Sequence, residues 1–551
     1  MKKHISKLAA LMLLGCSASY AALVSVPAGN ITANTTWTST NEYVLEGLVY
    51  VTNNATLTIQ PGTVIRSQPR TGDGVYDPGT IVITKSGQIS AVGTATNPII
   101  FTTAALNSGA NNVPKDTNGD GYFDRATYVS GTSTVPTNGT FLDAAPKTSP
   151  LPATSAVNYL NTQFHATNPT NILAALGGGI IIMGEAPINV YGKVGDGGSG
   201  FLEGRSYVEG VAETPDTIYG GDFPLDNSGK LSYISIRHGG AKLSSANEIN
   251  GLTLAGVGAG TQIDHIDVYV NFDDGVEIFG GTVNIKYINV NFVEDDGLDV
   301  DQGWTGAAQF VFVLQHPSFG DSLGEWDGGD EDPSNKATAG SPDYLTANGK
   351  PVQNCVIANG TYVGRGSTQK AGFNMRAGFG GEVLNNVVVQ AKDALKIDPE
   401  TTLETDGWDA RSRAILGEVK VRSNTFYGNG TNSLTYTQTA TNTNYAGVDT
   451  ATTNIVLGTF NTATSGWNNS TNNPNFKATA FSNVSTYVNP VGPQTGLPGT
   501  TWGSVAALPN NPFFTVTGNR GAFSTDKTAN LWTNGWTALN VSGVLVSKGN
   551  L

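Results

Sequence analysis

Two acidic triplets in the middle of the chain have the residue types and spacing of a cation-binding site. Asp273-Asp274-Gly275 recurs 22 residues later as Asp295-Asp296-Gly297. Short runs in which β-branched residues alternate with polar ones separate the triplets, which predicts strands joined by Gly-containing turns. If each unit is one coil of a solenoid, equivalent carboxylates of neighbouring coils lie about 4.8 Å apart. At an effective dielectric of about 20, two such charges repel by about 3 kcal/mol. The stacked carboxylates therefore favour a bound cation.

We expect this ion to be Ca²⁺ in a structural role, because oxygen ligands are the ones that Ca²⁺ prefers. The expected ligands are Asp273, Asp274, Glu277, Asp295, Asp296, Asp299 and Asp301. The alternative is that Asp-Asp-Gly is only a good turn sequence, in which aspartate side chains cap backbone amides. Both interpretations stay open at the level of sequence.

A second acidic motif resembles the start of a calcium-binding loop. It offers oxygen side chains at loop positions 1, 3, 5 and 9, a glycine at position 6 and a backbone carbonyl at position 7. The expected ligands are Asp116, Asn118, Asp120, Tyr122 and Asp124. Position 12 is Thr127 rather than the glutamate of an EF-hand, which indicates a free-standing loop that orders the surrounding insertion. The alternative is a polar surface turn.

Basic residues are the candidates for catalysis if the protein is an enzyme. Parallel β-helices host polysaccharide lyases, in which calcium and acidic residues hold a uronate carboxylate while Lys or Arg removes the proton α to it. The candidates are Arg237, Arg376 and Lys396, with Lys392, Asp393 and Asp398 nearby in the sequence. Each equally fits an ordinary surface position. The motifs of polygalacturonase-like hydrolases and the H-x-x-x-H spacing of zinc sites are missing, so the sequence favours a protein without catalysis.

Tryptophans in turn segments rich in Gly and Asp are candidates for sugar binding. These residues are Trp304, Trp326 and Trp408. Their rings beside carboxylates would stack on sugar rings, and the alternative is that they fill the core of the coils.

The elements that must position these residues are short strands in repeating coils. A self-similar unit of about 20–25 residues predicts a solenoid in which neighbouring units stack to bury a continuous core. Gly is abundant, with 69 of 551 residues, and only 13% of the chain is charged, which suits an all-β solenoid with several tight turns in every coil. We therefore predict an all-β parallel β-helix with long loop insertions.

Changes in pattern divide the chain into five segments. We predict a signal peptide at 1–21, an N-terminal cap with the first coils at 22–103, an insertion rich in Asn, Thr and Pro with the calcium-type loop at 104–172, the main β-helix at 173–428 with an acidic insertion at 316–350, and an irregular Asn/Thr-rich C-terminal region with further strands at 429–551.

The N-terminus indicates export from a bacterium. Lys2 and Lys3 precede a short apolar run, as in a secretory signal, and this run is too short to span a membrane. The run ends in a sequence that resembles a lipobox, which would make Cys16 a lipidated residue and the only membrane anchor. The alternative is cleavage after Ala21, which releases a soluble chain. In either case Cys355 has no disulfide partner, and we expect it to be a small buried residue on a strand.

The charge balance disfavours one class of partner. The chain has 44 acidic and 30 basic residues, with a net charge of −14. Nucleic-acid binding needs clustered Lys and Arg, so we expect no nucleic-acid partner, and divalent cations are more natural ligands.

Several segments resemble a family of bacterial envelope proteins. Members are secreted or lipid-anchored β-helix proteins that are usually labelled only as hypothetical lipoproteins. The similar segments, within about 40–425, are 178–189, 248–254, 273–284 with its Phe-Gly-Gly-Thr-Val-Asn motif, and 295–304. The resemblance implies a right-handed parallel β-helix at the bacterial surface and brings no established activity.

These observations together favour one function and leave two alternatives. We expect a calcium-stabilised β-helix that is secreted or lipid-anchored at the outer-membrane surface and has a structural or glycan-binding role. Its partner would be a cell-surface glycan or another envelope component. The first alternative is a calcium-dependent polysaccharide lyase or other glycan-active enzyme, and the second is an accessory component of an outer-membrane nutrient-uptake system.

Overall fold

The structure is a computed structural model of the chain. It describes residues 22–68, 78–104, 174–194, 200–243, 247–316, 319–329, 344–345, 351–366, 371–397, 410, 413–414, 417–430, 468–474, 476, 489–490, 505–524, 526, 528–541 and 544–548. Within this part of the chain, no helix has the length and apolar character needed to cross a membrane.

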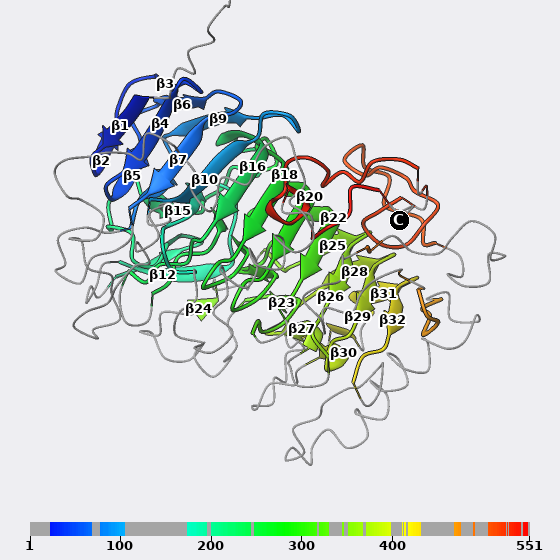
Figure 1. Cartoon of the computed structure of the whole chain (residues 1–551). Helices are drawn as coiled ribbons and strands as arrows, with labels where there is room; N and C mark the ends of the chain where they lie inside the picture. The colour runs from blue at the N-terminus through cyan, green and yellow to red at the C-terminus, as the bar shows by residue number, and fades with distance from the viewer. Residues whose placement is uncertain are drawn as a thin grey trace, which may run out of the picture.

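Two large sheets of stacked parallel strands form the body of the molecule (Figure 1). Sheet A has 17 strands: β1 (Ala22–Val26), β3 (Thr35–Trp37), β4 (Asn41–Leu45), β6 (Thr56–Ile59), β7 (Val64–Ser67), β9 (Gln88–Val92), β10 (Ile99–Thr103), β16 (Gly229–Arg237), β18 (Gln262–Tyr269), β20 (Asn284–Asn291), β22 (Ala307–Leu314), β25 (Cys355–Ala358), β26 (Thr361–Val363), β28 (Gly381–Leu384), β29 (Val387–Val389), β31 (Val419–Arg422) and β32 (Thr425–Tyr427).

Sheet B has ten strands: β2 (Gly29–Ile31), β5 (Leu48–Val51), β8 (Thr80–Ile83), β11 (Ile180–Met183), β17 (Leu252–Ala255), β19 (Val276–Phe279), β21 (Leu298–Asp301), β23 (Gly324–Asp327), β27 (Ala371–Arg376) and β30 (Asp393–Ile397). The chain alternates between the two sheets coil after coil, as in β18, β19, β20 and β21. This arrangement confirms the predicted parallel β-helix.

Smaller elements lie outside the two sheets. These are β12 (Val190–Val194), β13 (Gly200–Glu203) and β24 (Tyr344–Leu345) in one antiparallel sheet, β14 (Ser206–Tyr207) and β15 (Ile218–Tyr219) in another, and the short helix α4 (Ala538–Val541).

The long strands of sheet A bend in the middle, which makes each central coil three-sided. The first half of β16 pairs with β9 and its second half pairs with β10. At the bend, Tyr233, His265, Tyr287 and Phe310 have φ values of 52°, 52°, 58° and 61°. This left-handed backbone is costly for non-glycine residues. The four side chains stack in order, with ring centroids 4.1, 4.4 and 5.0 Å apart, and the stacking contributes to offsetting that cost.

A continuous hydrophobic core fills the coils. One cluster of buried residues extends from Trp37 to Phe426 and consists mainly of inward-facing Ile, Val and Leu. Because strand residues alternate between the two faces of a sheet, the residues between them point outward. Cys355 belongs to this core and is buried, as predicted.

The C-terminal part of the chain packs on the outside of sheet A, where the red segment lies beside the strands around β18 to β22 (Figure 1). Leu539 and Phe523 pack in one cluster with Phe292 and Phe312. The carboxylate of the buried Asp267 accepts a hydrogen bond of 2.9 Å from the backbone N–H of Ala538 at the start of α4. This segment therefore covers outward-facing apolar side chains that a bare solenoid would expose.

One predicted segment boundary needs correction. The acidic insertion predicted at 316–350 contains β23, which pairs in parallel register with both β21 and β27. This strand belongs to a regular coil, and its two acidic residues, Glu325 and Asp327, alternate with the core residue Trp326. The predicted signal peptide and nearly all of the insertion at 104–172 lie outside the described residues.

Candidate cation and ligand groove

An acidic surface covers the outer face of sheet B. The parallel register places Glu277, Asp299 and Glu325 in one row and Phe279, Asp301 and Asp327 in a second row. These residues point outward because the alternating positions, such as Ile278 and Val300, belong to the core. Three consecutive coils therefore present carboxylates side by side at strand spacing.

A repeated pair of polar residues forms the ladder that we call the carboxylate ladder. Each coil contributes one residue from the turn before the strand and one from the strand, three positions later. The pairs in chain order are Asn250 and Thr253, Asp274 and Glu277, Asp296 and Asp299, and Ser322 and Glu325. The two central pairs are acidic, and the first pair is neutral.

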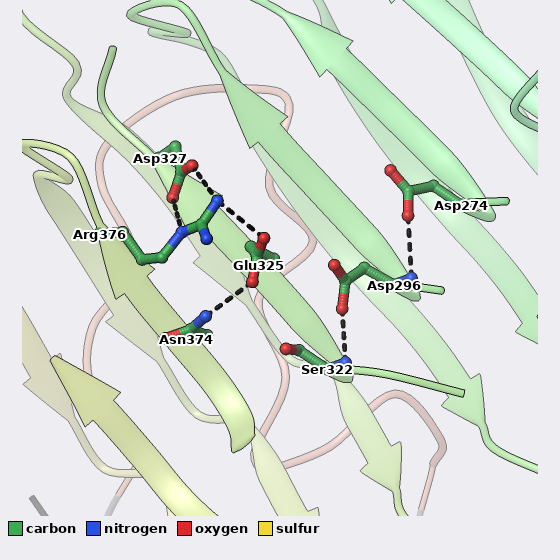
Figure 2. A network of polar contacts seen from close by, with 7 residues as sticks. All are labelled: Asp274, Asp296, Ser322, Glu325, Asp327, Asn374 and Arg376. Carbon is green, nitrogen blue, oxygen red and sulfur yellow. Dashed lines mark hydrogen bonds and ion pairs between the residues drawn. The ribbon is translucent and has the colours of Figure 1, made fainter. Parts of the chain in front are cut away.

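The turn aspartates of the ladder also cap backbone amides of the next coil (Figure 2). Oδ1 of Asp274 accepts a hydrogen bond of 2.8 Å from the N–H of Asp296, and Oδ1 of Asp296 accepts one of 2.5 Å from the N–H of Ser322. Capping was the alternative to cation binding in the sequence. Each carboxylate has a second oxygen, so capping and cation binding are compatible here.

Carboxylate oxygens gather closely enough to share an ion. Three groups of residues each bring one oxygen per residue within 4.8 Å of the others: Asp273, Asp274 and Asp295; Asp274, Asp296 and Asp299; and Asp295, Asp296 and Asp321. All of them except Asp321 are among the predicted ligands. The structure therefore brings the two acidic triplets together, as their spacing predicted.

Burial and mutual repulsion raise the pKa values of the ladder. Burial is the largest cause of the raised pKa of Asp274, Glu277, Asp296 and Asp299, and neighbouring carboxylates raise these pKa values further. For Asp273, burial followed by the charge of Asp295 raises the pKa to about 7. A charged ladder is thus unfavourable without a positive partner.

The ladder opens into a groove of about 1210 Å³ between sheet B and the segment around β14. Among its described lining residues, nine are acidic and one is basic. The acidic ones are Glu209, Glu213, Glu248, Asp273, Asp274, Glu277, Asp299, Asp301 and Asp327. Tyr50 and Ile181 line the part toward the N-terminal coils, and Phe279 lies on β19, the strand of the ladder residue Glu277.

Arg376 is the basic lining residue, and two carboxylates hold it (Figure 2). Its Nε and Nη2 donate to Asp327 at 3.0 and 2.7 Å, and Nη2 lies 2.8 Å from Oε2 of Glu325. This bidentate arrangement stabilises the charged guanidinium. Arg376 is therefore positioned to hold an acidic group more readily than to accept a proton.

Unpartnered oxygen atoms point to a ligand of the ladder. Among the described residues, Oδ1 of Asn250 and Oδ1 of Asp299 belong to the groove lining and are buried without a hydrogen-bond partner. Oγ of Ser322 in the ladder and Oδ1 of Asn374 are also buried and unpartnered. An unsatisfied buried polar atom costs about 1–3 kcal/mol. Carboxylate and amide oxygens are ligands of Ca²⁺, so the residues present fit a divalent cation.

The other predicted catalytic residues do not meet at the ladder. Arg237 is buried on the outer face of sheet A, where its Nε donates to Ser235 Oγ at 2.7 Å, and it is not among the described lining residues of the groove. Lys396 lies on β30 in register with Asn374, beyond the described groove lining. Asp393 begins the same strand, and Lys392 directly precedes it.

The predicted sugar-stacking role of two tryptophans is wrong. Trp304 and Trp326 are both 0% exposed and belong to the core of the coils. Nε1 of Trp304 donates to the backbone carbonyl of Val283 at 3.0 Å, and the ring of Trp326 lies 4.4 Å from that of Phe373. Both tryptophans therefore fill space inside the solenoid.

Some predicted residues lie outside the described part of the chain. These are the loop ligands Asp116, Asn118, Asp120, Tyr122 and Asp124, together with Cys16, Asp398 and Trp408.

Sequence reasoning missed the two ends of the ladder. Asn250 at one end, and Ser322 and Glu325 at the other, occupy the same register positions as the predicted aspartates. A signal existed, because Asp321-Ser322-Leu323-Gly324-Glu325 is a degenerate copy of the acidic triplet units. Loss of the Asp-Asp-Gly triplet and the surrounding charge concealed it.

The comparisons with known proteins identify a family. A family model described as a pectate-lyase-like beta helix domain matches residues 29–113 and 167–537. No curated protein and no solved structure gave a match.

Proposed function

Because the chain belongs to the pectate-lyase-like β-helix family, we propose that it is a glycan-binding protein whose carboxylate ladder holds Ca²⁺. The observation that carries this proposal is the two acidic pairs of the carboxylate ladder, which lie beside unpartnered buried oxygens in a large groove. These pairs are Asp274 with Glu277 and Asp296 with Asp299. The family supports a glycan as the ligand, and the many carboxylate oxygens of the two acidic pairs support a bound Ca²⁺ ion.

The ion has a structural and an electrostatic role in this proposal. Asp274, Asp296 and Asp299 would hold it, with Glu277 beside them. A bound Ca²⁺ would supply positive charge that neutralises the carboxylates of the ladder. The chain's own residues then fix the neighbouring coils through the caps on Asp296 and Ser322 and present the groove wall to a sugar chain.

The location in this proposal follows from the N-terminal sequence. The protein is exported and acts at the bacterial cell surface, either secreted or tethered through Cys16. Its partner is a surface glycan or another envelope component, and nucleic acid is not a partner.

Calcium titration by isothermal calorimetry tests the ion. The wild type is compared with Asp299→Asn, with Asp116→Asn/Asp120→Asn, and with Asp222→Asn, which changes an exposed acid outside the described groove lining. We expect Asp299→Asn to lose the groove site, the loop variant to retain it, and the control to match the wild type. Calcium binding that Asp299→Asn leaves unchanged would contradict a site at the ladder.

A second candidate function is glycan cleavage by a lyase, in which Arg376 of the groove would hold a uronate carboxylate and would not act as the base. In such a reaction a groove carboxylate takes the proton α to the uronate carboxyl group, the bond between the β carbon and the glycosidic oxygen breaks, and the departing oxygen takes up a proton. The reaction creates a carbon–carbon double bond that absorbs ultraviolet light. Formation of this product from a uronate polymer by the wild type, and its loss in Arg376→Ala, would support the lyase, whereas a flat absorbance trace would leave the binding function.

A further inference from the structure

The sign of the groove's charge limits which glycan can bind. The described lining has nine carboxylates and one arginine, so its acidic groups outnumber the positive charges of that arginine and one divalent ion together. A negatively charged polymer would meet repulsion from carboxylates that belong to neither the ion nor Arg376, including Glu209 and Glu213 on the opposite wall. Like-charge juxtaposition of this kind opposes binding.

The one basic lining residue does not reverse this balance. Arg376 forms ion pairs with Glu325 and Asp327. A ligand carboxylate that approached the guanidinium would have to compete with these two groups. Without a bound cation, the described lining therefore offers a uronate polymer no excess of positive charge.

The unpartnered atoms of the lining have one chemical character. Both buried lining atoms without a hydrogen-bond partner, Oδ1 of Asn250 and Oδ1 of Asp299, are acceptors. Asn250 is only 5% exposed, and its amide nitrogen already donates to Glu277. These acceptors need either a hydrogen-bond donor of a ligand or a bound cation. A primary ammonium group offers three N–H donors together with a positive charge.

The groove also changes character along the axis of the solenoid. One outward row reads Tyr50, Val82, Ile181, Thr253, Glu277 and Asp299 from coil to coil. The ring of Phe279 in the neighbouring row stacks with Tyr219 at 6.2 Å. Val82 and Ile181 are 0% and 1% exposed, so the apolar faces of sugar rings in the groove would pack on the half-buried rings of Tyr50 and Phe279, beside the charged part of the row.

From these observations we infer that the groove binds an amine-bearing glycan, a polymer of amino sugars with free amino groups. This inference rests on the proposed glycan-binding function and specifies its ligand class. The ammonium groups pair with wall and ladder carboxylates, and the apolar faces of the sugar rings pack on the aromatic part of the groove.

Three oligosaccharides of equal length test the inference: a glucosamine oligomer, its fully N-acetylated counterpart and a galacturonate oligomer, each titrated with and without calcium. We expect the glucosamine oligomer to bind at least about tenfold more tightly than the N-acetylated one, because acetylation removes each charge. We also expect its affinity to fall with added salt.

Variants of Glu209 and Glu213 distinguish binding of the glycan from binding of the calcium ion. Glu209→Gln/Glu213→Gln removes two negative charges outside the proposed ligands of Ca²⁺. The affinity for the glucosamine oligomer should fall about fivefold for each charge removed, while calcium affinity stays unchanged. Asp222→Asn/Glu46→Gln removes two acids outside the described groove lining and should change neither affinity.

Each other outcome overturns the inference. Calcium-dependent binding of the galacturonate oligomer with no binding of the amine would contradict the ligand class and leave the proposed function intact. Equal binding of the free and acetylated oligomers would show that charge does not select the ligand. Binding of none of the three, with calcium binding intact, would overturn the glycan ligand and retain the cation site.

Discussion

Oδ1 of Asp274 accepts a hydrogen bond of 2.8 Å from the backbone N–H of Asp296, the equivalent residue of the next coil. One carboxylate thus links two coils and lines the groove at the same time. The same residue type serves the fold through its acceptor oxygen and the site through its charge. These two roles can be separated by substitution, because asparagine keeps the acceptor and loses the charge.

Two substitutions of Asp274 should differ in their effect on stability without calcium at about pH 8. Asp274→Asn retains an oxygen for the N–H of Asp296 and removes a buried negative charge, so we expect the free energy of unfolding to rise by about 1–3 kcal/mol. Asp274→Ala removes the same charge but leaves that N–H unpaired, so we expect it to be about 1–3 kcal/mol less stable than Asp274→Asn. Urea unfolding of both variants measures the difference. Equal stability of the two variants would mean that the hydrogen bond to the N–H of Asp296 contributes nothing, and a loss of stability in Asp274→Asn would mean that the charge carries no penalty.

The calcium-free protein should become less stable as the pH rises from about 5 to about 8. Burial and the charge of Asp295 raise the pKa of Asp273 to about 7, and the pKa of Asp296 and Asp299 is raised as well. The folded state therefore binds more protons than the unfolded state in this range. Stability falls with pH wherever the folded state binds more protons.

Unfolding in a chelator at several pH values measures this trend, and calcium should raise the midpoint more at about pH 8 than at about pH 5 because deprotonated carboxylates bind it better. Asp273→Asn should flatten the curve. A calcium-free protein that gains stability over the same range would show that the raised pKa values do not control its stability.

Substitution by phenylalanine should destabilise the protein to different extents at the two core tryptophans. Trp304→Phe loses the hydrogen bond from Nε1 to Val283, whereas Nε1 of Trp326 is buried without a partner. We expect Trp304→Phe to cost about 1 kcal/mol more than Trp326→Phe. Denaturant unfolding checks the order, and calcium titration of both variants should match the wild type because neither ring lines the groove. The reverse order of stability would contradict the hydrogen bond to Val283.

Asp267 should hold the C-terminal segment on sheet A. Its carboxylate accepts hydrogen bonds from Ser235, Asn289 and the backbone of Ala538, and all of these donors are buried. Asp267→Ala removes the acceptor and should cost about 3 kcal/mol or more. Limited proteolysis should then cleave the segment at 505–548 faster.

Gln262→Ala, an exposed position on the same strand, provides the control for this prediction and should leave the cleavage rate unchanged. Resistance of Asp267→Ala to the protease at the level of the wild type would show that packing of Phe523 and Leu539 alone holds the segment.

The coils of the central β-helix could be predicted from short-range sequence patterns. Packing between residues far apart in the sequence could not. The 22-residue spacing of the acidic triplets fixed the coil length, so Asp273 and Asp295 were correctly stacked. The burial of Trp304 depends on how a turn folds into the coil, which composition does not show. The packing of Phe523 against Phe312 joins residues about 200 positions apart, and no local signal indicates it.

Anomalous diffraction from crystals grown with calcium tests the central claim most directly. The ladder predicts a peak between Asp274, Asp296 and Asp299, with carboxylate oxygens at about 2.3–2.6 Å. Crystals of Asp299→Asn should lose this peak. A ladder without anomalous density, in crystals that show calcium elsewhere on the chain, would contradict the account and reduce the paired aspartates to caps of neighbouring coils.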